Sequence, residues 1–185
     1  MKSLVKSSIL LIVLAFTGAL SLNAQSATTQ VGGEAMYPMK NIVENAVNSK
    51  SHTTLVAAVK AADLVEVLKG KGPFTVFAPV NDAFENLPAG TVETLLKPEN
   101  KATLSKVLTY HVVAGRYDFK AIKSMIKKGR YTLKTVSGGT LTFMANGSRN
   151  IIVKDENGNI ANINTYDVYQ SNGVIHSVDA VLLPK

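Results

Sequence analysis

The spacing of the hydrophobic residues changes near Arg130, and this change constrains the fold of the 185-residue chain more than any other feature. Between residues 41 and 128, apolar side chains recur at the three- and four-residue spacing of helices. From Arg130 onward they alternate with polar residues, which is the period of a strand. Because helices come first and strands follow, we predict an α+β domain and not a regular strand–helix alternation.

The same pattern predicts the order of the elements. Helices are predicted at 41–47, 53–62, 64–68, 82–87, 92–96, 101–112 and 119–128, and strands at 74–77, 131–136, 141–144, 150–154, 159–163, 165–170 and 174–183. The helix over 101–112 is the longest, and it places Leu104, Leu108 and His111 on one face. Asn157 and Gly158 form the strongest hairpin signal in the chain.

The thirteen residues GPFTVFAPVNDAF, from Gly72 to Phe84, connect the helical part to the first strand. A glycine and a proline end the preceding helix, and Pro79 ends the strand because it has no amide hydrogen to donate. Asn81 or Asp82 is expected to cap the next helix through a side-chain oxygen. The aromatic residues of the stretch are expected in the core: Phe74, Phe77 and Phe84. We therefore interpret this stretch as a joint in the architecture.

The first 24 residues have the composition of a signal peptide. Two lysines precede an apolar run, Ile9 to Phe16, that is too short to span a bilayer, and cleavage is expected after Ala24, with Ala27 as the alternative site. The alternative is an uncleaved anchor; no second apolar run is long enough to span a membrane. We expect a secreted or periplasmic protein with a flexible leader over residues 25–39 and one domain over residues 40–185.

The chain has no cysteine, which excludes disulfides, thiolate metal sites and a cysteine nucleophile. Its formal net charge is +7, and without the two lysines of the signal peptide it has 18 basic and 13 acidic residues. The basic residues cluster once, at Lys120, Lys123, Lys127, Lys128 and Arg130. This cluster is expected to be a solvated helix face, and the alternative is contact with an anionic polymer or with headgroups. Nucleic acid is not an expected partner, because no aromatic residues interleave with the cluster.

Three histidines are the side chains whose ordinary pKa lies near neutral pH. His52 precedes a helix and is expected to be solvated or to cap it, whereas His111 and His176 lie in apolar surroundings and are expected to be held by hydrogen bonds. A zinc site of His111, His176 and Asp179 is the alternative. No Gly-x-Ser-x-Gly motif occurs, and Asp155 is expected to be a solvated turn residue. We therefore predict no catalytic residue, no metal and no cofactor.

Three segments together resemble the fasciclin domain family of extracellular adhesion modules. They are GPFTVFAPVNDAF, LTYHVVAGRY from Leu108 to Tyr117, and NGVIHSVDAVLLP from Asn172 to Pro184. The resemblance covers about residues 40–184. The chain departs from the family pattern at Val80, where threonine is usual, and at Ser177, where an apolar residue is usual.

The resemblance implies a fold of helices packed around a wedge of strands, a role in adhesion, and no cofactor. It places the interaction surface near Tyr110 and His111. Family members that bind integrins use an Asp-Ile motif, but no aspartate of this chain is followed by isoleucine, so integrin recognition does not transfer. The other motif residues are interpreted as structural: Phe74, Phe77, Pro79, Asn81, Asp82, Phe84, Asn172, Gly173, His176 and Asp179. A signal-bearing single domain of this kind is typical of bacteria.

Two functions from different classes follow. The first is an exported, non-enzymatic adhesion module whose partner is a cell-surface or extracellular-matrix protein or a polysaccharide. The second is a carrier of a small apolar ligand, a pigment or a lipid, because the chain has many apolar but few aromatic residues, and some fasciclin-like proteins are associated with pigment binding. A hydrolase that uses His111 or His176 is a remote third alternative.

Overall fold

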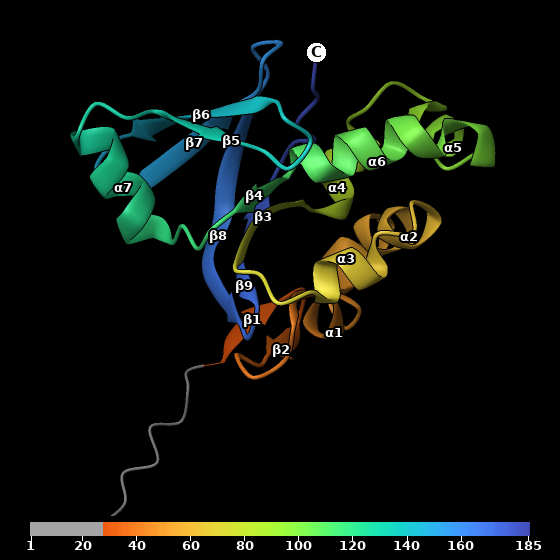
Figure 1. The fold of residues 1–185 in the computed structure, drawn as a ribbon, viewed down its shortest axis with the longest axis horizontal. Helices are drawn as coiled ribbons and strands as arrows, with labels where there is room; N and C mark the ends of the chain where they lie inside the picture. The colour runs from red at the N-terminus through yellow and green to blue at the C-terminus, as the bar shows by residue number, and fades with distance from the viewer. Residues whose placement is uncertain (1–27) are drawn as a thin grey trace, which may run out of the picture.

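A seven-stranded sheet forms the centre of the protein in a computed structural model that describes residues 28–185 (Figure 1). The strands are β3 (Phe74–Pro79), β4 (Val112–Ala114), β5 (Thr132–Lys134), β6 (Thr140–Asn146), β7 (Asn150–Lys154), β8 (Ile160–Gln170) and β9 (Gly173–Val178). Their order across the sheet is β4-β3-β9-β8-β7-β6-β5. Neighbours run antiparallel except β3 and β9, which run parallel and place Phe74 opposite Gly173. The predicted signal peptide, residues 1–24, lies outside the described residues.

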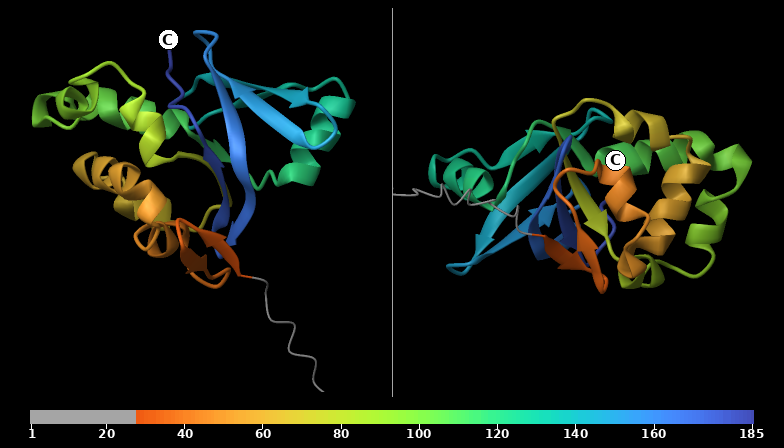
Figure 2. Two further views of the ribbon diagram at one scale, coloured as in Figure 1. Left: turned by 180° about the vertical axis from the view of Figure 1, so that it is seen from behind. Right: turned by 90° about the horizontal axis from the view of Figure 1, so that it is seen from below.

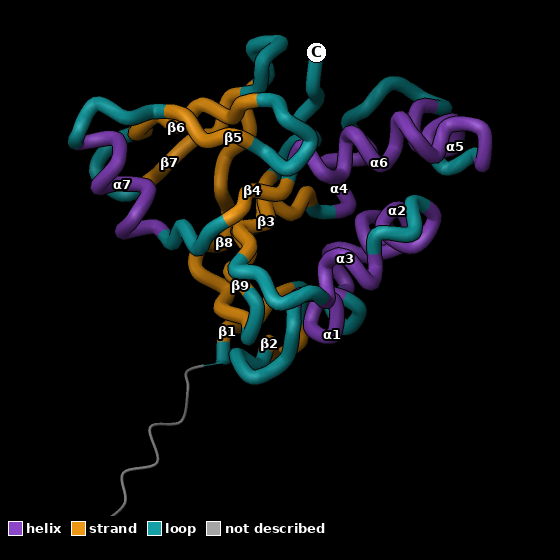
Figure 3. Tube along the Cα trace, in the orientation of Figure 1, coloured by secondary structure: helices purple, strands orange, loops and turns teal. Residues whose placement is uncertain are grey.

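Helices cover this sheet unevenly. They are α1 (Ile42–Ala46), α2 (Thr53–Ala61), α3 (Val65–Lys69), α4 (Asn81–Glu85), α5 (Thr91–Leu95), α6 (Lys101–Tyr110) and α7 (Phe119–Lys127), with short 3-10 turns η1 (Lys50–His52) and η2 (Pro98–Asn100). Figure 2 shows α1 to α6 gathered on one side, whereas α7 lies apart from them beside β6 and β7. The predicted α+β fold, with helices packed around a β-wedge, is confirmed, and Figure 3 shows the two kinds of element separated in space.

Several predicted elements have different limits in the structure: the closing strand predicted over 174–183, for example, ends at Val178 as β9. Two of the differences concern how elements begin, end or join within the sheet. The helix predicted over 101–112 ends at Tyr110, because Val112 to Ala114 pair with β3. The two strands predicted at 159–163 and 165–170 are one long strand, β8, whose register against β9 shifts near Thr165. Strand pairing across the sheet decides both limits, and local spacing does not reveal it.

The segment expected to be a flexible leader contains a hairpin of β1 (Thr29–Val31) and β2 (Glu34–Met36). Val31 and Met36 are buried in the core, so burial of apolar side chains holds the hairpin on the domain. The buried Asn45 side chain also accepts a hydrogen bond from Tyr37 N at 2.9 Å and donates one to Tyr37 O at 2.8 Å. The expected flexibility of residues 25–39 is therefore wrong for this hairpin; residues 25–27 lie outside the described part of the chain.

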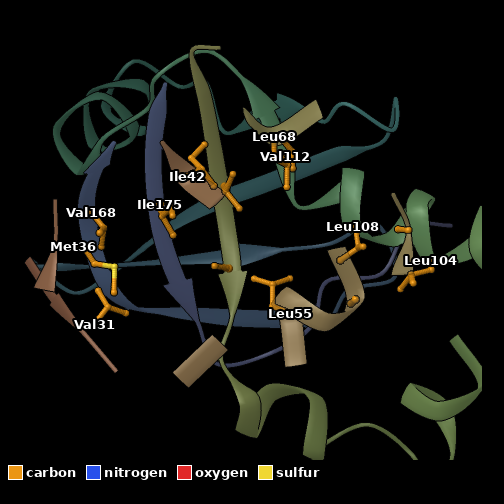
Figure 4. Packing of buried hydrophobic residues seen from close by; sticks show 14 residues of the cluster. Val31, Met36, Ile42, Leu55, Leu68, Leu104, Leu108, Val112, Val168 and Ile175 are labelled. Carbon is orange, nitrogen blue, oxygen red and sulfur yellow. The ribbon is translucent and has the colours of Figure 1, made fainter. Parts of the chain in front are cut away.

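The core is divided between the two faces of the sheet. Val76 and Phe77 are neighbours on β3 and pack on opposite faces, because successive side chains of a strand alternate. Figure 4 shows the cluster between the sheet and α1 to α6, which includes Ile42 and Leu55 from the helices and Ile175 from the sheet. The second cluster surrounds Phe77, whose ring lies 5.3 Å from that of Phe143. Burial of each such side chain contributes roughly 1.5–3 kcal/mol.

The joint from Gly72 to Phe84 caps a helix other than the expected one. The residue at the N-cap of α4 is Val80, which makes no side-chain hydrogen bond there, and Asp82 is exposed in the first turn. Asn81 instead accepts hydrogen bonds from Thr54 N and Thr53 Oγ1, each at 3.2 Å, and so caps α2 across the domain. The predicted cap of α4 is therefore wrong, although Phe77 and Pro79 are buried and Phe74 and Phe84 half-buried as core-packing residues.

We expect Val80→Thr to stabilise the protein by about 0.5–1 kcal/mol, because threonine at this position caps α4. Val80 already has the extended backbone of an N-cap, with φ −73° and ψ 166°. The measurement is the urea midpoint of wild type and variant, followed by far-UV circular dichroism. Val92→Thr, inside α5, is the matched control and should gain nothing. An unchanged or lower midpoint for Val80→Thr would contradict the capping argument.

Candidate functional site

The predicted interaction residue Tyr110 is a buried link between α6 and the β-hairpins. Its side chain is fully buried, and its hydroxyl donates to Thr140 O at 2.8 Å and accepts from Glu156 N at 3.0 Å. Burial raises the pKa of Tyr110 to about 12, since it penalises the phenolate. A methyl group on Gly139 would lie 2.6 Å from the ring, so the hairpin backbone packs directly on it.

His111 is also buried, at 3% exposure, and it joins α6 to the C-terminal segment. Its Nδ1 donates to Val107 O at 2.8 Å, and its Nε2 accepts from Leu182 N at 3.0 Å. These two bonds require the neutral ring, and burial lowers the pKa of His111 to about 4. The expectation that hydrogen bonds hold His111 is thus confirmed. Because the side chains of Tyr110 and His111 are both buried, neither can itself contact a partner, and an interaction surface in their neighbourhood would have to use other side chains.

His176 has a similar role on β9. It is fully buried, Nε2 donates to Tyr117 O at 2.8 Å, and Nδ1 accepts from Asp167 N at 3.3 Å. The ring stacks on Phe77 at 5.5 Å, and burial lowers the pKa of the imidazole. Both nitrogens of His176 and of His111 are thus already hydrogen-bonded, and neither offers a free lone pair to zinc.

The third residue of the alternative zinc site lies in a separate hydrogen-bonded pair. Asp179 accepts from Asn162 N at 2.7 Å and from Asn162 Nδ2 at 2.8 Å. Within residues 28–185, no three histidine or acidic side chains are grouped so that they could hold a metal ion. The hydrogen bonds of Asp179 fix the strand β8 beside β9, which is a structural role.

Asn172 and Gly173 join the third sequence block to the helices. Asn172 Oδ1 accepts from Ile42 N at 3.0 Å, and Nδ2 donates to Leu68 O and Gly70 O, each at 2.8 Å. The side chain therefore links the start of α1 to the end of α3. Gly173 lies so close to β3 that a methyl group on it would be 2.2 Å from Phe74 O.

Asp155 is a structural residue whose environment was predicted wrongly. It is only 4% exposed, and its carboxylate accepts from Asn157 N and Asn159 N within the turn and from Leu183 N of the C-terminal segment at 3.0 Å. The Asp-Glu-Asn-Gly-Asn sequence indicates the turn, but only the folded structure brings Leu183 to it. Hydrogen bonds compensate the burial of this carboxylate.

Positive charge is concentrated in one segment of the chain. Residues 116–154 contain nine lysine or arginine residues and one acidic residue, whereas residues 28–115 and 155–185 together contain nine basic and twelve acidic residues. The segment forms α7 and the adjoining strands β5 to β7. The ion pairs in the described part of the chain, Lys50–Glu34, Lys69–Glu66 and Lys101–Asp63, all lie outside it.

Seven of the nine basic residues are exposed, and we call the five on and around α7 the basic face: Lys120, Lys127, Lys128, Arg130 and Arg149. The other two exposed cations of the segment are Arg116 and Lys134. Lys123 brings the turn that holds Arg149 to α7, because its Nζ donates to Ser148 O at 2.8 Å. Ile122 and Met125, on the opposite side of α7, are buried. The sequence cluster indicated the lysines of the helix, but Arg149 joins them only through the fold.

A largely aliphatic cavity of about 380 Å³ lies between the sheet and the helices α1, α2, α3 and α6. Leu55 and Leu68 from the helices and Ile175 from the sheet line it, and all three are labelled in Figure 4. Val47 and Val67 line the cavity and remain about half exposed, at 48% and 54%, so the cavity opens to solvent beside them.

His52 lines the same cavity and is only 3% exposed, so the prediction of a solvated residue is wrong. His52 does occupy the N-cap position of α2, but its side chain makes no capping hydrogen bond. Its Nδ1 lies 2.8 Å from Ser49 Oγ, whereas its Nε2 has no hydrogen-bond partner among the described residues. Burial lowers the pKa of His52, and the Ala78 backbone near the ring offsets part of this effect, although it makes no hydrogen bond of ordinary distance and angle with Nε2. The cavity therefore contains one buried polar atom with unused hydrogen-bonding capacity.

Comparison with known proteins gives one consistent relationship. The sequence model of the Fasciclin domain matches residues 50–184. Protein sll1483 of Synechocystis is 50% identical over 143 residues, which are 77% of this chain and 73% of that protein. The cell surface glycolipoprotein MPB83 of Mycobacterium bovis is 33% identical over 159 residues, which are 83% of this chain and 64% of that protein.

A solved structure supports the relationship at the level of the fold. The FAS1 domain pair from the insect cell adhesion molecule Fasciclin I superposes with a TM-score of 0.71 at 17% sequence identity. The match covers 79% of this chain and 51% of that chain. Within residues 28–185, no helix is both long enough and apolar enough to cross a bilayer.

Proposed function

Because the chain belongs to the fasciclin domain family, we propose that it is an exported, non-enzymatic adhesion module that binds an anionic polysaccharide through its basic face. The names of two related proteins, a cell surface glycolipoprotein and a cell adhesion molecule, support the adhesion role. The predicted signal peptide supports a secreted or periplasmic location. The non-enzymatic part of the proposal is supported by His111 and His176, whose rings are neutral, buried and fully hydrogen-bonded.

The observation that carries the proposal is the separation of charge. Residues 116–154 contain nine basic residues and only one acidic residue. No ion pair among the described residues neutralises any of the nine. Lysine and arginine side chains gathered in this way raise the local concentration of anionic partners and accelerate association. A polymer of uronic acids presents repeated carboxylates that match such a surface.

A hydrated polymer fits the basic face better than a membrane does. A helix that lies in a bilayer surface needs an exposed apolar side, but Ile122 and Met125 of α7 are buried against the sheet. The exposed ring of Tyr131, directly after Arg130, provides an amphipathic aromatic surface beside the cations. Together these features favour a sugar polymer with carboxylate groups.

The test compares the exported wild-type protein with the triple variant Lys120→Gln/Lys127→Gln/Lys128→Gln. Calorimetry with alginate, a polyuronate, should show binding at low salt that weakens as salt is raised to about 0.15 M. Each lost surface ion pair is worth roughly 0.5 kcal/mol, so the triple variant should bind roughly tenfold more weakly. The matched control is Lys71→Gln/Lys97→Gln/Lys185→Gln, which removes the same charge from exposed positions outside the basic face.

The two triple variants separate a specific surface from net charge. Near wild-type affinity in the control, with weak binding in the α7 variant, supports the proposal. Equal losses in both variants, or no alginate binding by wild type at low salt, would overturn it. Binding to vesicles of anionic phospholipid without binding to alginate would also overturn it in favour of a membrane partner.

A further inference from the structure

The aliphatic cavity beside α1 to α3 has the dimensions and the lining of a ligand site. Pockets that bind small molecules commonly measure about 300–1,000 Å³ and combine apolar walls with few polar groups, and the volume here is about 380 Å³. The basic face lies on the segment 116–154, and the cavity lining includes a single residue of that segment, Val136. Ligand binding in the cavity would thus be independent of polysaccharide binding at the basic face.

Almost all polar groups of the cavity lining are either hydrogen-bonded within the protein or exposed to solvent at the rim. The charged side chains Glu44, Lys60 and Lys69 are exposed at the rim. Thr109 Oγ1 donates to Ser105 O at 2.6 Å within α6, and both nitrogens of His111 are hydrogen-bonded. Among the described lining residues, the buried polar atom with unused capacity is therefore His52 Nε2.

This composition disfavours an ordered filling of water. A buried water needs two to four polar partners, and a single free nitrogen does not supply them. A charged ligand inside the cavity is also disfavoured, because no charged side chain of the lining is buried to compensate it. An aliphatic molecule with one neutral oxygen satisfies both the walls and the free nitrogen.

We propose that this cavity binds a neutral aliphatic molecule with one terminal oxygen, such as a medium-chain alcohol, with its chain against the walls and its oxygen on His52 Nε2. A hydroxyl can both donate and accept, so it pairs with either tautomer of the His52 ring. The half-exposed Val47 and Val67 mark the opening through which the chain enters.

The first experiment measures displacement of the neutral fluorescent probe N-phenyl-1-naphthylamine from the exported protein. We expect 1-decanol to displace the probe at lower concentration than decane by roughly fivefold, which is the value of one neutral hydrogen bond. Decanoate should be weaker than 1-decanol, because its charge must enter the cavity or hold the chain partly outside. Absence of probe binding, or displacement by decanoate at least as good as by 1-decanol, would overturn the proposal.

The second experiment uses variants that close the cavity or remove its polar atom. Val59→Phe should fill the cavity and abolish probe binding without lowering the melting temperature, whereas Val92→Phe, outside the cavity, should leave probe binding unchanged. Val56→Phe replaces Val59→Phe if that variant does not fold. His52→Leu should keep decane binding and lose the roughly fivefold preference for 1-decanol. A preference that survives His52→Leu, or probe binding that survives a folded blocking variant, would refute the assigned site.

Discussion

Replacing Gly173 with alanine is expected to cost about 4 kcal/mol of the free energy of unfolding, a large share of the roughly 5–15 kcal/mol that holds a typical domain folded. The added methyl group would lie 2.2 Å from Phe74 O and 3.1 Å from Ile42 Cδ1. The first of these atoms belongs to the backbone of β3, which pairs with β9 in the middle of the sheet. Relief of the clash therefore requires β3 and β9 to move apart.

The measurement is urea unfolding of wild type and Gly173→Ala, followed by far-UV circular dichroism. Gly147→Ala is the matched control, because Gly147 has φ 74° but a methyl group there would meet nothing within 4 Å. The control should lose only about 1–2 kcal/mol, the cost of a left-handed backbone for an ordinary residue. Equal losses in the two variants would show that close strand packing is not what requires glycine at 173.

Acidification from pH 6.5 to pH 4 is expected to destabilise the protein by about 3 kcal/mol through His111 alone. Burial lowers the pKa of His111 from its ordinary 6.5 to about 4, so in this interval the unfolded chain binds a proton that the folded chain does not. The stabilising effect is therefore complete above pH 6.5 and is lost as the pH falls through this interval. Burial lowers the pKa of His52 and His176 as well, and both add to the loss in the same direction.

This prediction is checked by urea titrations at several pH values between 7.5 and 4. The variant His111→Gln should be less stable than wild type at pH 7.5, because it disturbs the bonds to Val107 and Leu182, but its stability should fall less steeply with acidification. An unfolding free energy of wild type that stays constant between pH 6.5 and 4.5 would contradict the neutral, buried state of these rings.

The fold was predictable because its main signals are local. The change of hydrophobic period near Arg130 predicts helices before strands, and three sequence blocks carry the family resemblance. The errors arise where long-range contacts override local pattern. Asn81 caps α2 instead of α4, and β1 and β2 are ordered because their apolar side chains meet the core. The spacing of neighbouring residues in the sequence does not predict either contact.

The two exceptions to the family pattern have structural counterparts. Val80 occupies the N-cap of α4, where the usual threonine would supply the missing side-chain bond. Ser177 is 2% exposed, and its Oγ has no hydrogen-bond partner among the described residues, which agrees with the usual preference for an apolar side chain. We expect both departures to reduce the free energy of unfolding without changing the fold.

The candidate sites were less predictable than the fold. Sequence pattern indicated the lysines of α7, but placed the interaction surface at Tyr110 and His111, which the structure buries. Whether Tyr110 and His111 are exposed depends on how α6 packs against the hairpins and the C-terminal segment. The sequence of α6 alone does not determine this packing. The cavity was unpredictable for the same reason, since its walls come from helices and strands that are distant in the chain.

The most direct test of the proposed adhesion role is an NMR titration of the ¹⁵N-labelled protein with a short polyuronate at low salt. Amide shifts are expected to concentrate in α7, in residues 128–131 and in the turn around Arg149, and to vanish as salt is raised. Shifts confined to the helices α1 to α6, or an absence of shifts at low salt, would contradict a role for the basic face.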